Sequence, residues 1–239
     1  MSEAGRQLPL GVSLSLETRL EDFVPGANQE VLDAFRQRAT QAVPGCLYLH
    51  GPRASGKSHL LQGLCRRADE LGRGASYLPL GEQGLDAPAV LSGWEALDLV
   101  CLDNLDWLAG ESAWERALLS LYEGLGSSGG SLVVAARRPP AGIGLALPDL
   151  ASRLASGPVY QLKTLDENGL EEALRRRLER RGLELPADCA RWLLRRARRD
   201  MHSLSELADR LDRLSLSAQR RLTVPFLREV LGPLPAGEE

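Results

Sequence analysis

The sequence predicts an α/β protein in which a five-stranded parallel sheet domain is followed by a small domain made only of helices. Short apolar runs alternate with helical stretches over residues 46–162, a pattern typical of a parallel sheet buried on both faces. A glycine-rich segment links the first run to a helix, an arrangement found in proteins that bind phosphate groups. From Asp166 onward, the periodicity of apolar residues is helical only.

The expected strands are the apolar runs 46–49, 75–80, 97–103, 131–136 and 158–162. Ahead of them, Asn28 is expected to cap a helix that runs to about Ala42. Between the third and fourth runs a helix is expected over 111–125. Its apolar residues recur at helical spacing and are most simply core residues: Trp114, Leu118, Leu121 and Tyr122.

Four helices are expected in the C-terminal part, with starts set by capping residues. Asp166 caps the first, which runs to about Arg181, and a second covers 186–199. Ser203 and Glu206 form a capping box for the third, and the fourth begins near Thr223. The expected domains are an arm over 1–22, a nucleotide-binding domain over 23–164, a helical lid over 165–232 and a disordered tail over 233–239.

Composition excludes several classes of protein. The 239 residues have a net charge of −3, which argues against a globally basic nucleic-acid binder. The four cysteines are widely spaced and suit reduced core packing better than a metal site or disulfides. No apolar run is long enough to cross a membrane and no secretory leader is recognisable, so a cytoplasmic protein without a membrane partner is expected.

The segment after the first expected strand matches the phosphate-binding loop, or P-loop, pattern of two glycines followed by Lys and Ser. Its backbone N–H groups would surround a polyphosphate, Lys57 would reach the outer phosphates, and Ser58 would offer a hydroxyl to Mg²⁺. Only two lysines occur in the chain, and one is at this position. The loop residues expected to bind nucleotide are Gly51, Pro52, Arg53, Ala54, Ser55, Gly56, Lys57 and Ser58.

Asp103 ends the apolar run 99–102, where a P-loop protein needs a carboxylate that holds Mg²⁺ through water. The alternative, an aspartate that caps the following turn, remains open. The next residue is Asn104, whose amide cannot accept the proton of an attacking water as a second acid would. Asp106 would be a poor substitute if the strand continued through residue 104.

The N-terminal arm contains a short polar and apolar segment, Gln7, Leu8, Pro9 and Leu10. An extended segment of this kind can dock in an apolar pocket of a partner, although the residues alone fit an ordinary flexible tail better.

Several of these motifs together resemble the AAA+ domain of the bacterial replication initiator DnaA and, more closely, the Hda family of DnaA paralogues that inactivate it. The likeness covers residues 5–232. It rests on the P-loop, the strand end at Asp103 and Asn104, the run 147–154 that contains Arg153, the helical lid, and the segment 219–226. The DNA-reading domain of DnaA has no counterpart in the sequence.

The resemblance implies a role for several residues. The segment Gln7–Leu10 matches the one that docks on the β sliding clamp of the replicative DNA polymerase III. Arg153 matches the arginine finger, which reaches across a subunit interface to a γ-phosphate. Phe23, Val24 and Pro25 match the segment beside the adenine ring.

Three departures from the family pattern favour a site that holds ADP over one that turns over ATP. Asn104 replaces the second acid, as in Hda itself, which implies weak or absent intrinsic ATPase activity. Arg137 stands where the family has an acidic residue that senses the γ-phosphate. His202 occupies the place of a lid arginine that touches the phosphates, and a neutral imidazole binds them more weakly.

The function implied is that of a regulator which binds the DNA-loaded clamp, reaches DNA only through it, and drives hydrolysis of DnaA-bound ATP. Self-association is left open. The alternative is an AAA+ ATPase that acts directly on DNA, such as a helicase loader or an initiator variant. Ten arginines against three acids between Arg175 and Arg199 leave two options for the lid: a surface for DNA or an acidic partner, or a solvated helix face.

Overall fold

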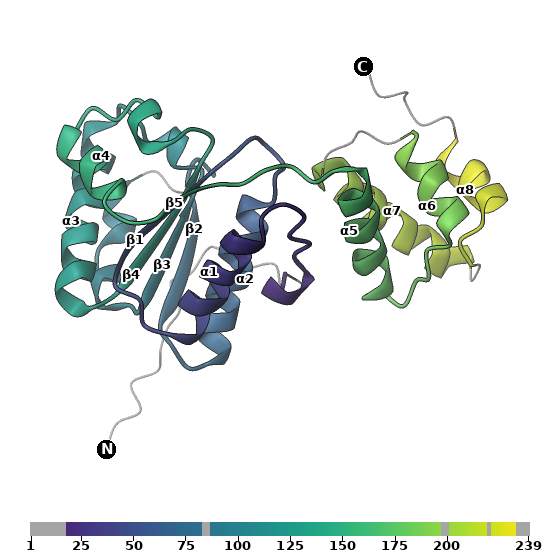
Figure 1. Cartoon of the computed structure of the whole chain (residues 1–239), viewed down its shortest axis with the longest axis horizontal. Helices are drawn as coiled ribbons and strands as arrows, with labels where there is room; N and C mark the ends of the chain where they lie inside the picture. The colour runs from purple at the N-terminus through teal and green to yellow at the C-terminus, as the bar shows by residue number, and fades with distance from the viewer. Residues whose placement is uncertain (1–17, 83–86, 197–200, 219–220, 233–239) are drawn as a thin grey trace. The chain divides into compact units, whose positions relative to one another are not determined.

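The computed structural model describes residues 18–82, 87–196, 201–218 and 221–232. It contains one five-stranded sheet followed by a helical bundle (Figure 1). The strands are β1 (Gly45–His50), β2 (Ala75–Pro79), β3 (Leu99–Asp103), β4 (Ser131–Ala136) and β5 (Val159–Gln161). The expected α/β class with a lid is confirmed.

All strand pairs in the sheet are parallel, in the order β2-β3-β4-β1-β5. The first strand therefore lies between the fourth and the fifth, and each connection must cross over a face of the sheet. Strands β1 to β4 are buried almost throughout, as their continuous apolar runs predicted. The edge strand β5 is largely exposed.

Helices cover both faces of this sheet (Figure 1). On one face, α3 (Ser112–Ser128) and α4 (Pro148–Leu154) share a core with one side of the strands, and Trp114 and Leu118 are buried there as expected. On the other face, α2 (Lys57–Glu70) packs against β2, β3 and β4. There α1 (Gln29–Thr40) is tied to the start of β4, because the guanidinium of Arg38 donates to the hydroxyl of Ser131.

Short 3₁₀ turns fill the connections: η1 (Leu20–Asp22), η2 (Pro88–Leu91), η3 (Trp94–Ala96), η4 (Leu105–Trp107) and η5 (Pro140–Gly142). The first of them is fixed to α2. The carbonyl of Arg19 lies 2.8 Å from the Nε2 atom of His59, and a Cβ on Gly63 would meet the backbone of Leu20 at 2.8 Å. The chain that leads out of the N-terminal arm is thus bound to the helix that follows the P-loop.

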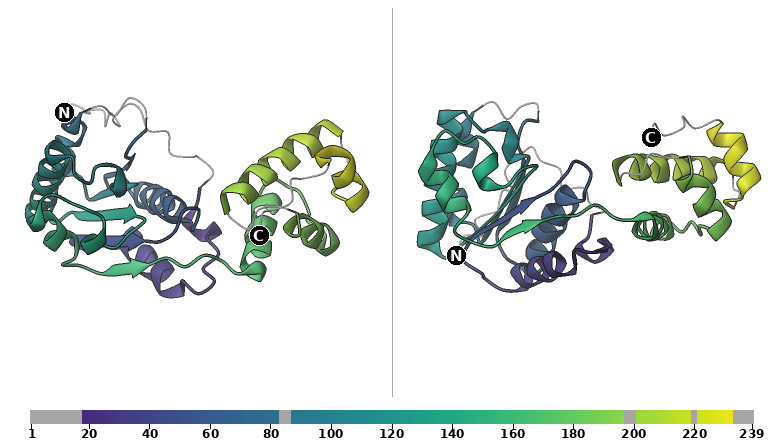
Figure 2. Two further views of the ribbon diagram at one scale, coloured as in Figure 1. Left: turned by 90° about the horizontal axis from the view of Figure 1, so that it is seen from above. Right: turned by 45° about the horizontal axis from the view of Figure 1, so that its top comes forward.

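The lid consists of α5 (Glu167–Glu179), α6 (Ala187–Leu194), α7 (Met201–Ala218) and α8 (Val224–Leu231), which share a hydrophobic core of their own (Figure 2). The predicted cap at Asp166 and the predicted helix start near Thr223 are both confirmed. The carboxylate of Asp166 accepts from the N–H of Gly169 at 2.8 Å, and the hydroxyl of Thr223 accepts from the N–H of Phe226 at 3.4 Å. No described helix is long and apolar enough to cross a membrane.

Two helix predictions in the lid are wrong. The helix expected over 186–199 ends at Leu194, and α7 begins at Met201, so that Ser203 lies inside the helix instead of capping it. A serine followed three residues later by a glutamate also occurs within helices, where the hydrophobic period sets the true start.

Candidate functional site

The P-loop connects β1 to α2, with the helix beginning at Lys57. Ala54 and Gly56 adopt left-handed backbone conformations, with φ of 58° and 99°. These two turns curl the chain between strand and helix, and the N–H groups of the first helical turn have no partner within the helix. The loop and the helix start together form the anion-binding geometry that a polyphosphate requires.

Phe23 packs against the P-loop. A Cβ built on Gly56 would lie 2.9 Å from its ring, so the glycine is required by the close approach of Phe23 as well as by its backbone angle. Phe23 and Val24 are buried, and Pro25 is half-buried. The three residues predicted to lie beside adenine therefore include one that contacts the loop directly.

Asn28 directly precedes α1 and its carbonyl accepts from the N–H of Leu32, in the position expected of a cap; its side chain makes further contacts. Its amide nitrogen donates to the carbonyl of Lys163 at 2.9 Å, and its amide oxygen accepts from the N–H of the same residue at 2.8 Å. The nitrogen also donates to the carbonyl of Pro25. Asn28 thus joins the segment that contains Phe23 to the chain that enters the lid, a contact between residues 135 apart that local sequence could not reveal.

Lys57 is buried and its Nζ atom donates to the carbonyl of Gly51 at 2.8 Å. Burial lowers the pKa of its ammonium group; Asp103 and Asp106 oppose this shift, and Arg137 adds to it. The pKa of His50, at the end of β1, is lowered by burial and by Lys57. A buried ammonium ion gains strongly from a polyphosphate, because the negative charge of the ligand compensates the hydration that burial removed.

Asp103 is 1% exposed and ends β3. Its Oδ2 atom accepts from the hydroxyl of Tyr77 at 3.0 Å, and its Oδ1 atom accepts from the N–H of Asn104 at 2.8 Å. The carboxylate therefore closes the following turn, which is one of the two roles considered for it, and it also raises the pKa of the Lys57 ammonium group. Its role in holding Mg²⁺ stays a prediction.

Asp106 is the residue that sequence reasoning undervalued. The strand stops at Asp103, Asn104 takes a left-handed conformation, and η4 turns Asp106 back toward the neighbouring strand. Its carboxylate accepts from the N–H of Arg137 at 2.7 Å and raises the pKa of Lys57. An asparagine directly after a strand was the available signal, since Asn tolerates the left-handed region.

The residues present fit a magnesium ion that is held largely through water. Ser58 is exposed in the first turn of α2, where its hydroxyl is available beside bound phosphates. Each oxygen of Asp103 keeps a second lone pair that could accept from a metal-bound water. In the described part of the chain, no group of three or more His, Cys, Asp or Glu side chains could hold a metal by itself.

Arg153 is exposed on the short helix α4, away from the P-loop in sequence. Its Nε atom lies 3.5 Å from a carboxylate oxygen of Asp149 one turn earlier, and both side chains are about half exposed. Such a pair contributes little to stability, so the guanidinium can exchange this partner for a stronger anion at low cost.

The loop that leads into α4 is held by a buried carboxylate. Glu115 on α3 is completely buried and accepts three backbone hydrogen bonds, from Gly110 at 2.7 Å, Ala146 at 2.9 Å and Leu147 at 2.7 Å. A charge can be buried in this way only because the N–H groups compensate it. Sequence analysis did not single out Glu115, which on its own looks like any helical glutamate.

The arginines of the lid fall into two groups. Those on and just after α5 are all in ion pairs: Arg175 with Glu171, Arg176 with Glu172, Arg177 and Arg181 with Asp209, and Arg180 with Asp22. This first group therefore fits the second alternative for the lid, a solvated helix face whose charges are paired. The second group consists of Arg191 on α6 and of Arg195 and Arg196 just after this helix.

Comparison with known proteins shows what these features resemble. Domain III of the replication initiation protein DnaA from Thermotoga maritima has 19% sequence identity, a TM-score of 0.77, and matches 93% of this chain and 99% of its own. AMPPCP-bound DnaA from Aquifex aeolicus has 18% identity and a TM-score of 0.71, over 85% of this chain and 67% of its own. These likenesses establish the AAA+ fold.

The fold is shared more widely. The Holliday junction branch migration motor RuvB from Thermotoga maritima matches with 19% identity and a TM-score of 0.67, over 92% of this chain and 72% of its own. The fold alone therefore does not select between initiator-like and motor-like relatives. The helical domain does, because residues 162–231 match the family model of the Hda lid domain.

The helical domain is similar to the Hda lid. Together with a sheet domain that folds like domain III of DnaA, it confirms the resemblance to Hda, a DnaA paralogue. His202 lies in the first turn of α7 within the Hda lid, and its side chain is outside the described atoms. The segment Gln7, Leu8, Pro9 and Leu10 and the tail 233–239 also lie outside the described residues.

Proposed function

We propose that this protein is a negative regulator of replication initiation which stimulates hydrolysis of DnaA-bound ATP and so yields inactive ADP-DnaA. In this proposal Arg153 is an arginine finger supplied in trans, and Gln7–Leu10 dock on the β sliding clamp loaded on DNA. The protein works in the cytoplasm. The Hda lid, joined to a sheet domain that folds like domain III of DnaA, supports the assignment.

The observation that carries this proposal is the state of Arg153. A finger must be exposed, weakly paired and carried by a fixed element, since it stabilises charge that develops on a neighbouring subunit's phosphate. Arg153 is exposed, its ion pair with Asp149 is a long contact, and Glu115 holds the loop that enters its helix.

The protein's own nucleotide is proposed to be retained ADP, bound by the P-loop with Phe23, Val24 and Pro25 beside the adenine and His202 on the lid side. AMPPCP-bound DnaA from Aquifex aeolicus supports an adenine nucleotide. Asp103 and Asp106 already accept hydrogen bonds from Tyr77, Asn104 and Arg137, which leaves both poorly placed to activate water. This disfavours the alternative of an independent ATPase on DNA.

The test measures turnover of DnaA-bound ATP with clamp loaded on DNA. Wild type should accelerate turnover, and Arg153→Ala should reduce the acceleration by about 10³-fold, the lower end for loss of an arginine finger. Deletion of residues 1–17 should abolish the clamp dependence. Arg116→Ala, an exposed arginine on α3, is the matched control and should behave as wild type. Full acceleration by both Arg153→Ala and the deletion variant would refute the proposal.

A further inference from the structure

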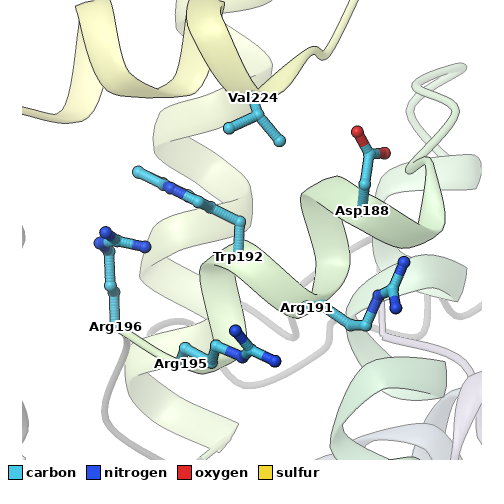
Figure 3. Close-up of a pocket in the computed structure, with 6 residues that line it drawn as sticks. All are labelled: Asp188, Arg191, Trp192, Arg195, Arg196 and Val224. Carbon is cyan, nitrogen blue, oxygen red and sulfur yellow. The ribbon is translucent and has the colours of Figure 1, made fainter.

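A small pocket opens on the lid between α6 and the start of α8. We call it the lid pocket; Figure 3 shows the residues that line it, Asp188, Arg191, Trp192, Arg195, Arg196 and Val224. Its volume is about 240 Å³. Pockets for cofactors and drug-sized ligands usually have roughly 300–1,000 Å³, so this one suits a side chain better than a whole small molecule.

The lid pocket has an apolar floor and a cationic rim. Trp192 and Val224 face one another across it from α6 and α8, while Arg195 and Arg196 extend from the end of α6 (Figure 3). The guanidinium of Arg196 lies 4.5 Å from the centroid of the Trp192 ring, which it covers. Since arginine stems are themselves apolar, charge is concentrated at the outer ends of these side chains.

The three rim arginines contrast with those of α5. In the part of the chain that the structure describes, no carboxylate lies within ion-pair distance of Arg191, Arg195 or Arg196, and all three are exposed. Asp188, the acid among the residues that line the pocket, is on the opposite side of Trp192 from Arg196 (Figure 3). Among the described residues, no carboxylate therefore pairs with the rim, whereas the arginines on and just after α5 are paired.

The chemistry of the floor selects the occupant. A nucleic acid would bring phosphates to the arginines, but a base needs the face of an aromatic ring for stacking, and Arg196 already lies over the Trp192 ring. A peptide can offer an apolar side chain for the floor and carboxylates for the rim at the same time.

We propose that the lid pocket binds an acidic protein segment, with one apolar side chain seated between Trp192 and Val224 and flanking carboxylates on Arg191 and Arg195. This inference does not depend on the proposed function, because it concerns the lid alone. In this proposal the lid binds a protein segment of its own, separately from the residues of the P-loop domain.

The test is fluorescence anisotropy of a labelled peptide in which one leucine is flanked on each side by glutamates, titrated with the full chain. Arg191→Gln/Arg195→Gln should weaken binding about tenfold, which corresponds to about 1.4 kcal/mol. The matched control, Arg116→Gln/Arg213→Gln, removes the same charge at two exposed positions outside the pocket and should leave the affinity unchanged. Binding should also weaken as salt rises.

Two further probes separate the contributions. The peptide with glycine in place of leucine should bind more weakly, as should the original peptide to Val224→Gln, because each removes one side of the apolar contact. Equal losses in the rim and control variants, or full affinity for the glycine peptide, would overturn the proposal. Tighter binding of a single-stranded oligonucleotide that is lost in Arg191→Gln/Arg195→Gln would also overturn it, since the site would then serve nucleic acid.

Discussion

The ammonium group of Lys57 is buried near two carboxylates, Asp103 and Asp106, and near the cation Arg137. Burial is the largest influence on its pKa and lowers it. Without ligand, this lysine therefore releases its proton at a lower pH than an exposed lysine. Because bound phosphate favours the charged form, nucleotide binding and protonation of Lys57 must strengthen each other.

We expect the affinity for ADP to fall as pH rises through the lowered pKa of Lys57, below the ordinary value of 10.5. Calorimetric titration of ADP binding between neutral and alkaline pH measures this, together with proton uptake on binding. The control is Lys57→Arg, whose guanidinium stays charged over this range. An identical decline of affinity in both proteins would exclude Lys57 as its source.

The stability of the ligand-free protein should change with pH in the opposite sense. A lysine with a lowered pKa in the folded state binds fewer protons when folded than when unfolded, between its lowered pKa and its ordinary one. The contribution of Lys57 to the free energy of unfolding therefore rises with pH within that window. A buried lysine that opposes folding when it is charged is acceptable where its function is to bind phosphate.

At the scale of elements, Glu115 links the turn before α3 to the loop before α4. Glu115→Gln leaves one oxygen to accept the hydrogen bonds and turns an NH₂ group toward a backbone N–H. We expect a loss of about 2–3 kcal/mol in the free energy of unfolding, the usual cost of an unsatisfied group in a charged hydrogen-bond network. Chemical denaturation measures it.

Hydrogen exchange tests the local form of this prediction. The amides of Gly110, Ala146 and Leu147 should exchange faster in Glu115→Gln than in wild type, because each loses the carboxylate it donates to. Glu111→Gln is the matched control, since Glu111 is exposed just before the same helix and its side chain makes no capping bond. Unchanged exchange at all three amides would show that the loop is held by other contacts.

Elements whose signals are local were predicted well. The buried strands appear where apolar runs stand, and the starts of α5 and α8 appear where Asp166 and Thr223 cap them. The error at Ser203 comes from a local pattern that also occurs inside helices. The contacts of the Asn28 side chain were missed for another reason, because nothing nearby in sequence indicates Lys163 as its partner.

In the candidate site too, residues with a local sequence signal were predicted, whereas residues whose roles depend on distant contacts were not. The P-loop and Asp103 follow from a spacing that phosphate chemistry dictates, so sequence was enough to find them. Asp106 and Glu115 were missed or undervalued because their roles depend on where β3 stops and on loops about thirty residues away. Arg153 could be selected from the many arginines only through its family motif.

The molecule as a whole should behave as a nucleotide-binding protein with little turnover. ADP at 100 times its dissociation constant should raise the free energy of unfolding by about 2.7 kcal/mol. Thermal denaturation with and without ADP measures this, and Lys57→Ala should abolish the shift. ATP incubated with purified protein alone should stay largely intact by chromatography; rapid hydrolysis would favour the independent ATPase.

Because Arg19 and Leu20 are attached to α2, the chain between them and Leu10 limits the distance that the N-terminal arm can span. Eight residues lie between Leu10 and Arg19, which makes nine residue steps, and a fully extended chain covers at most about 3.5 Å per step. If Gln7–Leu10 are held on a partner, the root of the arm beside His59 and Gly63 stays within about 30 Å of that anchor. That radius is close to the width of a small domain, so the arm would keep the nucleotide-binding domain within reach of only those molecules that adjoin its anchor.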